Sequence, residues 1–111
     1  MAEFAHESEA QVAGLLTGYG IRFEYEPTTF VLETDTDGNV VEAFTPDFYL
    51  PDFDTYVELT TMRQSLVTKK NRKVRRLAEV RPDVRVKLLY RRDIERLGSK
   101  YGLGSALADA A

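Results

Sequence analysis

The stretch Thr45–Thr60, TPDFYLPDFDTYVELT, decides the fold because it contains two apolar runs separated by a turn. Strands are expected at Ala43–Leu50 and Thr55–Thr60, where aromatic and β-branched side chains are frequent. The turn falls at 51–54, where proline and aspartate are typical turn residues. This stretch therefore predicts an antiparallel hairpin.

A turn centred between Asp52 and Phe53 fixes the register of this hairpin. The expected pairs, in order from the turn, are Leu50 with Thr55, Tyr49 with Tyr56, Phe48 with Val57, and Asp47 with Glu58. Directly opposed side chains lie about 4.5–5.5 Å apart at Cβ, and two like charges at that distance are unfavourable. A divalent cation such as Mg²⁺ would compensate, because it binds carboxylate oxygens together with water. The alternative is that both carboxylates lie at a solvated edge of the sheet.

The net charge of −3 hides a strong asymmetry along the chain. Residues 1–60 carry one basic and thirteen acidic side chains, whereas residues 61–92 carry twelve basic and two acidic ones. Residues 93–111 carry two basic and three acidic side chains. This separation indicates a cation partner for the first part of the chain and a polyanion partner for the second.

A basic helix is predicted after the hairpin, from Ser65 or Thr68 to about Val80, since Pro82 prevents a much longer one. Lys70 lies on the apolar, inward stripe of this helix, where a lysine needs a carboxylate or a phosphate. The other basic side chains fall mostly on outer faces, where they are candidates to bind a nucleic-acid backbone: Lys69, Arg72, Lys73 and Arg76. The alternative is a solvated helix face, although its like charges repel one another.

The segments around the hairpin and the basic helix complete an α/β domain. The expected elements are a helix at 5–19, strands at Ile21–Glu26 and Phe30–Leu32, a turn at Asp35–Asn39, a strand at Val84–Tyr90 and a helix at Arg91–Tyr101. Their order predicts a mixed sheet flanked by helices. We expect one domain at 1–101, followed by a flexible tail at 102–111.

The hairpin and the residues before it resemble the PD-(D/E)XK nuclease superfamily. The resemblance lies in Thr45–Pro51 followed by Tyr56–Thr60. Upstream, Ser8–Leu16 and Gly20–Pro27 are similar to the first helix and strand of the branch that includes Vsr-like and transposon-end-cleaving enzymes. The resemblance covers about residues 5–95. It implies a restriction-endonuclease-like αβββαβ core and metal-dependent hydrolysis of nucleic-acid phosphodiester bonds.

The resemblance also implies a set of metal ligands. Asp47 and Glu58 would hold Mg²⁺ or Mn²⁺, with the Leu59 carbonyl as a further ligand. Glu9 on the first helix would be the additional acidic residue found in many members.

The sequence departs from the family pattern at one position. The family's lysine, two residues after the glutamate, is here Thr60, whose hydroxyl cannot stabilise phosphate charge as an ammonium does. Lys70 is the candidate to supply that ammonium from the next helix. There it would orient the attacking water and neutralise the transition state, while the metal lowers the pKa of the water.

A second, narrower resemblance covers Glu58–Lys73. This stretch is similar to an N-terminal domain that precedes a hypoxanthine phosphoribosyltransferase in some bacteria, which suggests a context of nucleotide metabolism or RNA salvage. Within it, Arg63 and Gln64 follow the strand that carries Glu58, so they could contact a phosphate or cap the next helix.

Composition excludes several other chemistries. Without cysteine the chain has no disulfides, thiolate zinc sites or thiol nucleophiles, and a single histidine argues against Ser-His-Asp catalysis. The N-terminus lacks the regions of a signal peptide, and no apolar stretch approaches the ~18 residues of a membrane span. We therefore expect a cytoplasmic protein that does not bind membranes.

Three functions remain open on the sequence alone. The first is a Mg²⁺- or Mn²⁺-dependent endonuclease, with DNA favoured over RNA as the substrate. The second is a non-catalytic nucleic-acid-binding module with a degenerate nuclease fold, and the third is an accessory domain that docks on a partner enzyme. A homodimer that cuts two strands is a further alternative.

Overall fold

The computed structural model describes residues 7–60 and 64–97. Its elements, in chain order, are α1 (Glu7–Gly18), β1 (Glu24–Tyr25), β2 (Phe30–Thr34), β3 (Val40–Phe44), β4 (Phe48–Leu50), a 3-10 turn (Pro51–Phe53), β5 (Thr55–Thr60), α2 (Gln64–Val80), β6 (Val86–Tyr90) and α3 (Arg91–Leu97). The expected α/β class, with helices beside a mixed sheet, is confirmed. The expected tail at 102–111 lies outside the described residues.

The main sheet has the strand order β1-β4-β5-β6. β4 is antiparallel to both β1 and β5, whereas β6 is parallel to β5. The predicted hairpin register is confirmed for Phe48 with Val57, Tyr49 with Tyr56, and Leu50 with Thr55. Asp54 closes the turn with φ 47°, and its N–H donates to the Pro51 carbonyl.

The prediction of one continuous strand at Ala43–Leu50 is wrong. The chain leaves β3 after Phe44 and enters β4 at Phe48, so the two strands belong to different sheets. Pro46, which is buried, lies between them and has no N–H to donate to a ladder. In the described part of the chain, five strands therefore precede α2, where three or four were expected.

The first strand is also shorter than predicted, because Ile21–Glu26 contributes only two paired residues. Glu24 pairs with Tyr49 and Tyr25 with Phe48, at the outer edge of the short strand β4. Glu26 then adopts φ 46°, which turns the chain out of the sheet just before Pro27.

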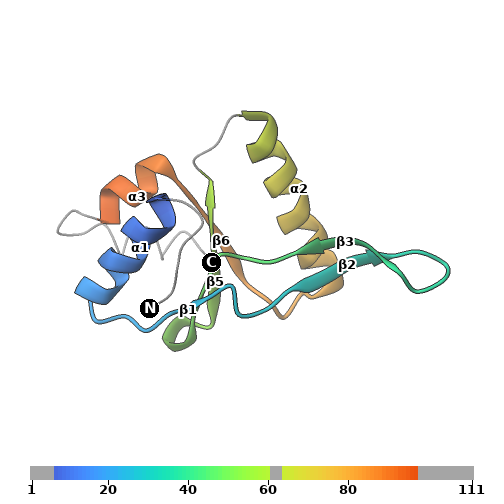
Figure 1. Cartoon of the computed structure of the whole chain (residues 1–111), viewed down its shortest axis with the longest axis horizontal. Helices are drawn as coiled ribbons and strands as arrows, with labels where there is room; N and C mark the ends of the chain where they lie inside the picture. Colours follow the sequence, from blue (N-terminus) through green and yellow to red (C-terminus); the bar gives the residue numbers. More distant parts are fainter. Residues whose placement is uncertain (1–6, 61–63, 98–111) are drawn as a thin grey trace.

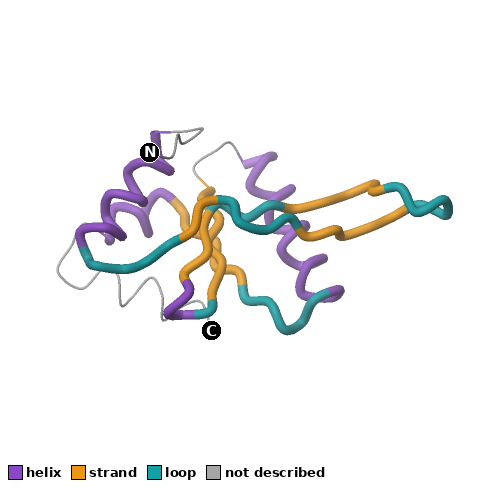
Figure 2. The backbone as a smooth tube through the Cα atoms, turned by 60° about the horizontal axis from the view of Figure 1, so that its bottom comes forward, coloured by secondary structure: helices purple, strands orange, loops and turns teal. Residues whose placement is uncertain are grey.

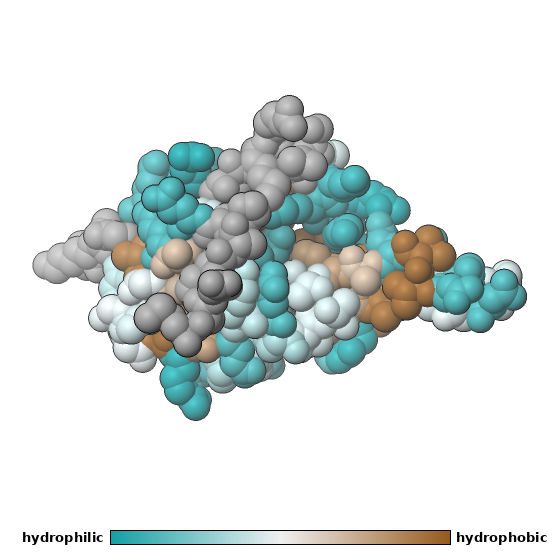
Figure 3. Space-filling view, in the orientation of Figure 1, coloured by the Kyte–Doolittle hydropathy of each residue, from teal (hydrophilic) through white to brown (hydrophobic). Residues whose placement is uncertain are grey.

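β2 and β3 form a separate two-stranded hairpin that projects from the body of the molecule (Figures 1 and 2). The predicted turn is confirmed: the Asp35 carboxylate accepts the N–H groups of Asp37 and Asn39 at 2.9 Å. One face of the hairpin packs on α2 through Phe30, Leu32 and Phe44, which contact Leu77. Hydrophobic side chains also reach the surface of this hairpin (Figure 3), among them Val31, Val40 and Val41.

The larger core lies between the main sheet and the helices α1 and α3, which cover one face while α2 lies on the other (Figure 1). Its buried members are Val12, Ala13, Leu16, Phe48, Leu50, Val57, Leu59, Leu89 and Ile94. Phe48 is completely buried, and the rings of Phe23 and Tyr25 pack on it with centroids 5.5 and 5.6 Å away. The hairpin that carries the predicted site is thus anchored by its apolar face.

None of the helices in residues 7–60 and 64–97 is long and apolar enough to cross a membrane.

Replacing Phe48 by alanine should test this anchor. The Phe48→Ala change leaves a cavity under α1 and is expected to lower the free energy of unfolding by about 3–5 kcal/mol, measured by urea denaturation. Phe53→Ala is the matched control, because Phe53 lies in the turn and is 39% exposed. An equal loss of stability in both variants would contradict the assignment of Phe48 to the core.

Candidate active site

Asp47 and Glu58 lie side by side where β4 begins. The Asp47 N–H donates to Glu58 Oε1 at 3.0 Å, and the Leu59 N–H donates to Asp47 Oδ2 at 2.9 Å. Each carboxylate therefore accepts a backbone N–H from the opposite strand. The two acids that the hairpin register predicts as neighbours are brought together in this way.

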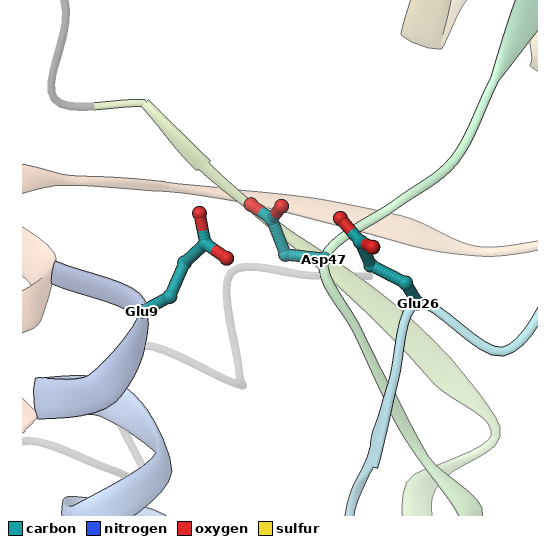
Figure 4. Close-up of side chains that lie close together, drawn as sticks. All are labelled: Glu9, Glu26 and Asp47. Carbon is teal, nitrogen blue, oxygen red and sulfur yellow. The ribbon is translucent and has the colours of Figure 1, made fainter. Parts of the chain in front are cut away.

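Two further carboxylates approach Asp47 from other parts of the chain. Glu9 comes from the first turn of α1, and Glu26 follows β1 (Figure 4). One carboxylate oxygen from each of Glu9, Glu26 and Asp47 lies within 4.8 Å of the other two. Glu9 is buried, and its Oε1 accepts a 2.5 Å hydrogen bond from the Tyr25 hydroxyl. This cluster has the oxygen ligands that Mg²⁺ and Mn²⁺ prefer.

Glu26 is the member of this cluster that sequence reasoning missed. Its N–H donates to the Asp47 carbonyl at 2.8 Å, which holds the two residues side by side. An acidic residue between a strand and Pro27 was a signal available in the sequence. The direction in which the Glu26 side chain points, however, depends on its positive φ, a conformation that is uncommon for residues other than glycine.

Lys70 reaches the other side of the acidic pair from α2. Its Nζ lies 3.0 Å from Glu58 Oε2 and donates to the Leu59 carbonyl at 2.5 Å. The Lys70 side chain is 19% exposed and that of Glu58 7%. The inward orientation predicted from the helical phase of Lys70 is confirmed, and its partner is a carboxylate.

Burial shifts the titration of both central carboxylates. Burial raises the pKa of Glu58 to about 7, and the nearby Asp47 carboxylate adds to the increase while the Lys70 ammonium opposes it. Burial also raises the pKa of Asp47 above its usual value, and the Glu9 carboxylate acts in the same direction. One ammonium therefore does not compensate the local negative charge, and an additional cation would be favoured here.

Thr60, at the position of the family's lysine, is buried. It is 3% exposed, and its hydroxyl has no hydrogen-bond partner in the part of the chain that the structure describes. The ammonium nearest to Glu58 among these residues is therefore that of Lys70.

The other predicted nucleic-acid-binding residues have different surroundings. Arg72 forms an ion pair with Glu42 at 2.6 Å, Lys73 donates to the Ala43 carbonyl at 3.1 Å, and Arg76 pairs with Glu79 at 3.1 Å. Lys69 is exposed and has no hydrogen-bond or ion-pair partner within the described ranges. Two of the four basic side chains thus contact the β2–β3 hairpin.

Two further predicted contacts cannot be placed on this surface, since Arg63 and the side chain of Gln64 lie outside the described residues.

No family model, no curated protein and no solved structure matches this chain.

The raised pKa of Glu58 predicts a pH dependence of stability. Between about pH 4.5 and pH 7 the folded protein keeps the Glu58 proton, whereas the unfolded chain releases it. The unfolded state then binds fewer protons, so this group's contribution to stability falls as the pH rises through that range. Glu58→Gln cannot titrate and should gain up to about 3 kcal/mol relative to wild type over the same interval.

The measurement is the free energy of unfolding of both proteins as a function of pH. Glu95→Gln, which replaces an exposed glutamate on α3, is the control. Parallel pH profiles for wild type and Glu58→Gln would contradict the raised pKa.

Proposed function

We propose that the protein is a metal-dependent nuclease that hydrolyses phosphodiester bonds in nucleic acid, with DNA as the preferred substrate. The observation that carries the proposal is the convergence of Glu9, Asp47, Glu58 and Lys70 from α1, the start of β4, β5 and α2. Carboxylates that bind a divalent cation, beside an ammonium that contacts phosphate, are the groups that phosphodiester hydrolysis requires.

The order of elements supports membership of the PD-(D/E)XK superfamily. When the separate β2–β3 hairpin is left aside, the chain runs α1, β1, β4, β5, α2, β6, and all four strands lie in one sheet. This order agrees with the αβββαβ order that the resemblance implies, and the agreement supports the proposal. The β2–β3 hairpin is then an insertion between the first and second core strands.

The residues present fit Mg²⁺ or Mn²⁺. Glu9, Glu26 and Asp47 offer hard oxygen ligands, and a cation bound beside Asp47 would offset the burial that raises the pKa of its carboxyl group. A divalent cation bound there would lower the pKa of its water and so supply hydroxide for attack on phosphorus. The cation's presence would also favour ionised Glu58 at neutral pH.

The remaining groups of the site orient the substrate and stabilise charge. Lys70 uses two of its three N–H bonds for Glu58 and the Leu59 carbonyl, which leaves the third for a phosphate oxygen. Glu58 positions both Lys70 and the Asp47 backbone through its two oxygens. Along α2, the exposed side chains of Lys69 and Arg75 are available for neighbouring phosphates.

Cleavage assays test this function directly. Wild type with Mg²⁺ or Mn²⁺ is expected to cut at least one of duplex, branched or single-stranded DNA, with RNA as a comparison substrate. Asp47→Asn should slow cleavage about 100-fold or more, because it removes the charge at the centre of the metal ligands. Asp37→Asn, at an exposed position in the β2–β3 turn, is the matched control and should retain activity. Equal rates for the two variants would contradict the proposed site.

The second candidate function is nucleic-acid binding without cleavage. Thr60 favours it, because the usual lysine position is occupied by a buried, uncharged side chain. Salt-dependent binding by wild type, with no cleavage under any metal condition, would support this candidate over the nuclease.

Both functions predict that α2 contacts phosphates. Combining Lys69→Ala with Arg75→Ala should weaken duplex binding and reduce the slope of log K against log salt by about 2, since each lost phosphate contact changes it by about 0.9. The measurement is fluorescence anisotropy over a salt series. Arg22→Ala is the matched control, because Arg22 is an exposed arginine paired with Asp52 outside α2. An unchanged slope in the double variant would count against α2 as the binding surface.

A further inference from the structure

The oxygens around the site divide into two sets. Glu9, Glu26 and Asp47 supply one set, whose oxygens lie within 4.8 Å of one another. Glu58 Oε2 and the Leu59 carbonyl form the other set, and both contact Lys70 Nζ, at 3.0 and 2.5 Å. Asp47 belongs to the first set but is tied to the second through the Leu59 N–H.

The family resemblance predicts a metal ion on Asp47, Glu58 and the Leu59 carbonyl, and the last two of these ligands form the second set. A carboxylate oxygen and a backbone carbonyl are suitable ligands for Mg²⁺ or Mn²⁺, but both oxygens here accept N–H bonds from an ammonium. Mg²⁺ needs its oxygens at about 2.0–2.1 Å, so a metal ion on these two oxygens would lie close to the ammonium. Repulsion between the two positive charges in a largely buried site therefore disfavours a metal ion there while Lys70 is in place.

The Lys70 ammonium is held firmly enough to compete with a metal ion for these two oxygens. Its side chain and that of Glu58 are largely buried, and its stem lies on the inward stripe of α2 near Val67 and Val74. The other oxygen of Glu58 already accepts the Asp47 N–H, so the carboxylate is fixed from both sides. Removing Lys70 from these oxygens would leave a buried carboxylate without its counter-charge.

We propose that Lys70 is a built-in cation that keeps metal off Glu58 and the Leu59 carbonyl, so that the protein binds a single divalent ion at Glu9, Glu26 and Asp47. The inference rests on the proposed function for that ion. In this arrangement Glu58 is a positioning residue rather than a metal ligand.

The number of bound Mn²⁺ ions tests the inference without any nucleic acid. Equilibrium dialysis and isothermal titration of the full chain with Mn²⁺ at neutral pH should give one ion for wild type. Lys70→Met keeps an unbranched side chain but removes the ammonium group, and it should bind a second ion at the released oxygens, with an affinity within about tenfold of the first. Lys70→Arg retains the cation and should bind one ion. Lys69→Met is the matched control and should also bind one.

Acidic variants in the wild-type background give a second readout that does not depend on Lys70→Met folding. Glu58→Gln removes no ligand of the proposed ion and should weaken the Mn²⁺ affinity less than Glu9→Gln and Asp47→Asn, which should each weaken it about tenfold or more. Circular dichroism establishes that each variant is folded.

Several results would overturn the inference. Two ions on wild type, one ion with unchanged affinity on folded Lys70→Met, or a loss of affinity in Glu58→Gln as large as that in Asp47→Asn would each do so. Two ions on a wild type that cleaves DNA would leave the nuclease function standing and overturn only the role of Lys70. One ion on a wild type that cuts no substrate would overturn the nuclease function and leave the single-ion arrangement standing. A wild type that binds no Mn²⁺ would overturn both.

Discussion

The pairing of β4 with β5 is the constraint on which the rest of the structure depends. Its register buries Phe48 and Val57 against α1 and α3. The same register sets Asp47 beside Glu58. Beyond the last backbone pair, the two carboxylates accept the backbone N–H groups of the opposite strand. The apolar contacts hold the strands together, and this allows two acids to remain close at the sheet's end despite their repulsion.

The site costs free energy, because burial raises the pKa values of Asp47 and Glu58, and the Asp47 carboxylate raises the pKa of Glu58 further. A structural ion pair would be balanced by one lysine per carboxylate, whereas this cluster has one ammonium near several acids. Ionisable groups with shifted pKa values are typical of functional sites, because a bound cation or substrate compensates their charge. A cation bound beside Asp47 would offset part of this cost.

Local patterns predicted the parts of the fold that local physics controls. The symmetric turn gave the Phe48–Val57 register, and helical phase gave the inward direction of Lys70. Contacts between segments that lie far apart in the chain were not predictable in the same way. The left-handed conformation of Glu26, whose N–H donates to the Asp47 carbonyl, and the ion pair of Arg72 with Glu42 each depend on a partner far along the chain. Periodicity identifies the face on which a side chain lies but not the element that meets it.

The acidic part and the basic part of the sequence supply opposite sides of the site around β5. The acidic first part of the chain supplies Glu9, Glu26 and Asp47 to one side of the site, and the basic second part supplies Lys70 to the other. Glu58 and Leu59 lie between these two sides and contact Asp47 on one side and Lys70 on the other. Because Lys70 reaches Glu58 from a neighbouring helix, an ammonium can stand beside the carboxylates without a lysine on β5. The buried Thr60 is then compatible with phosphodiester chemistry, provided that α2 stays packed against the sheet.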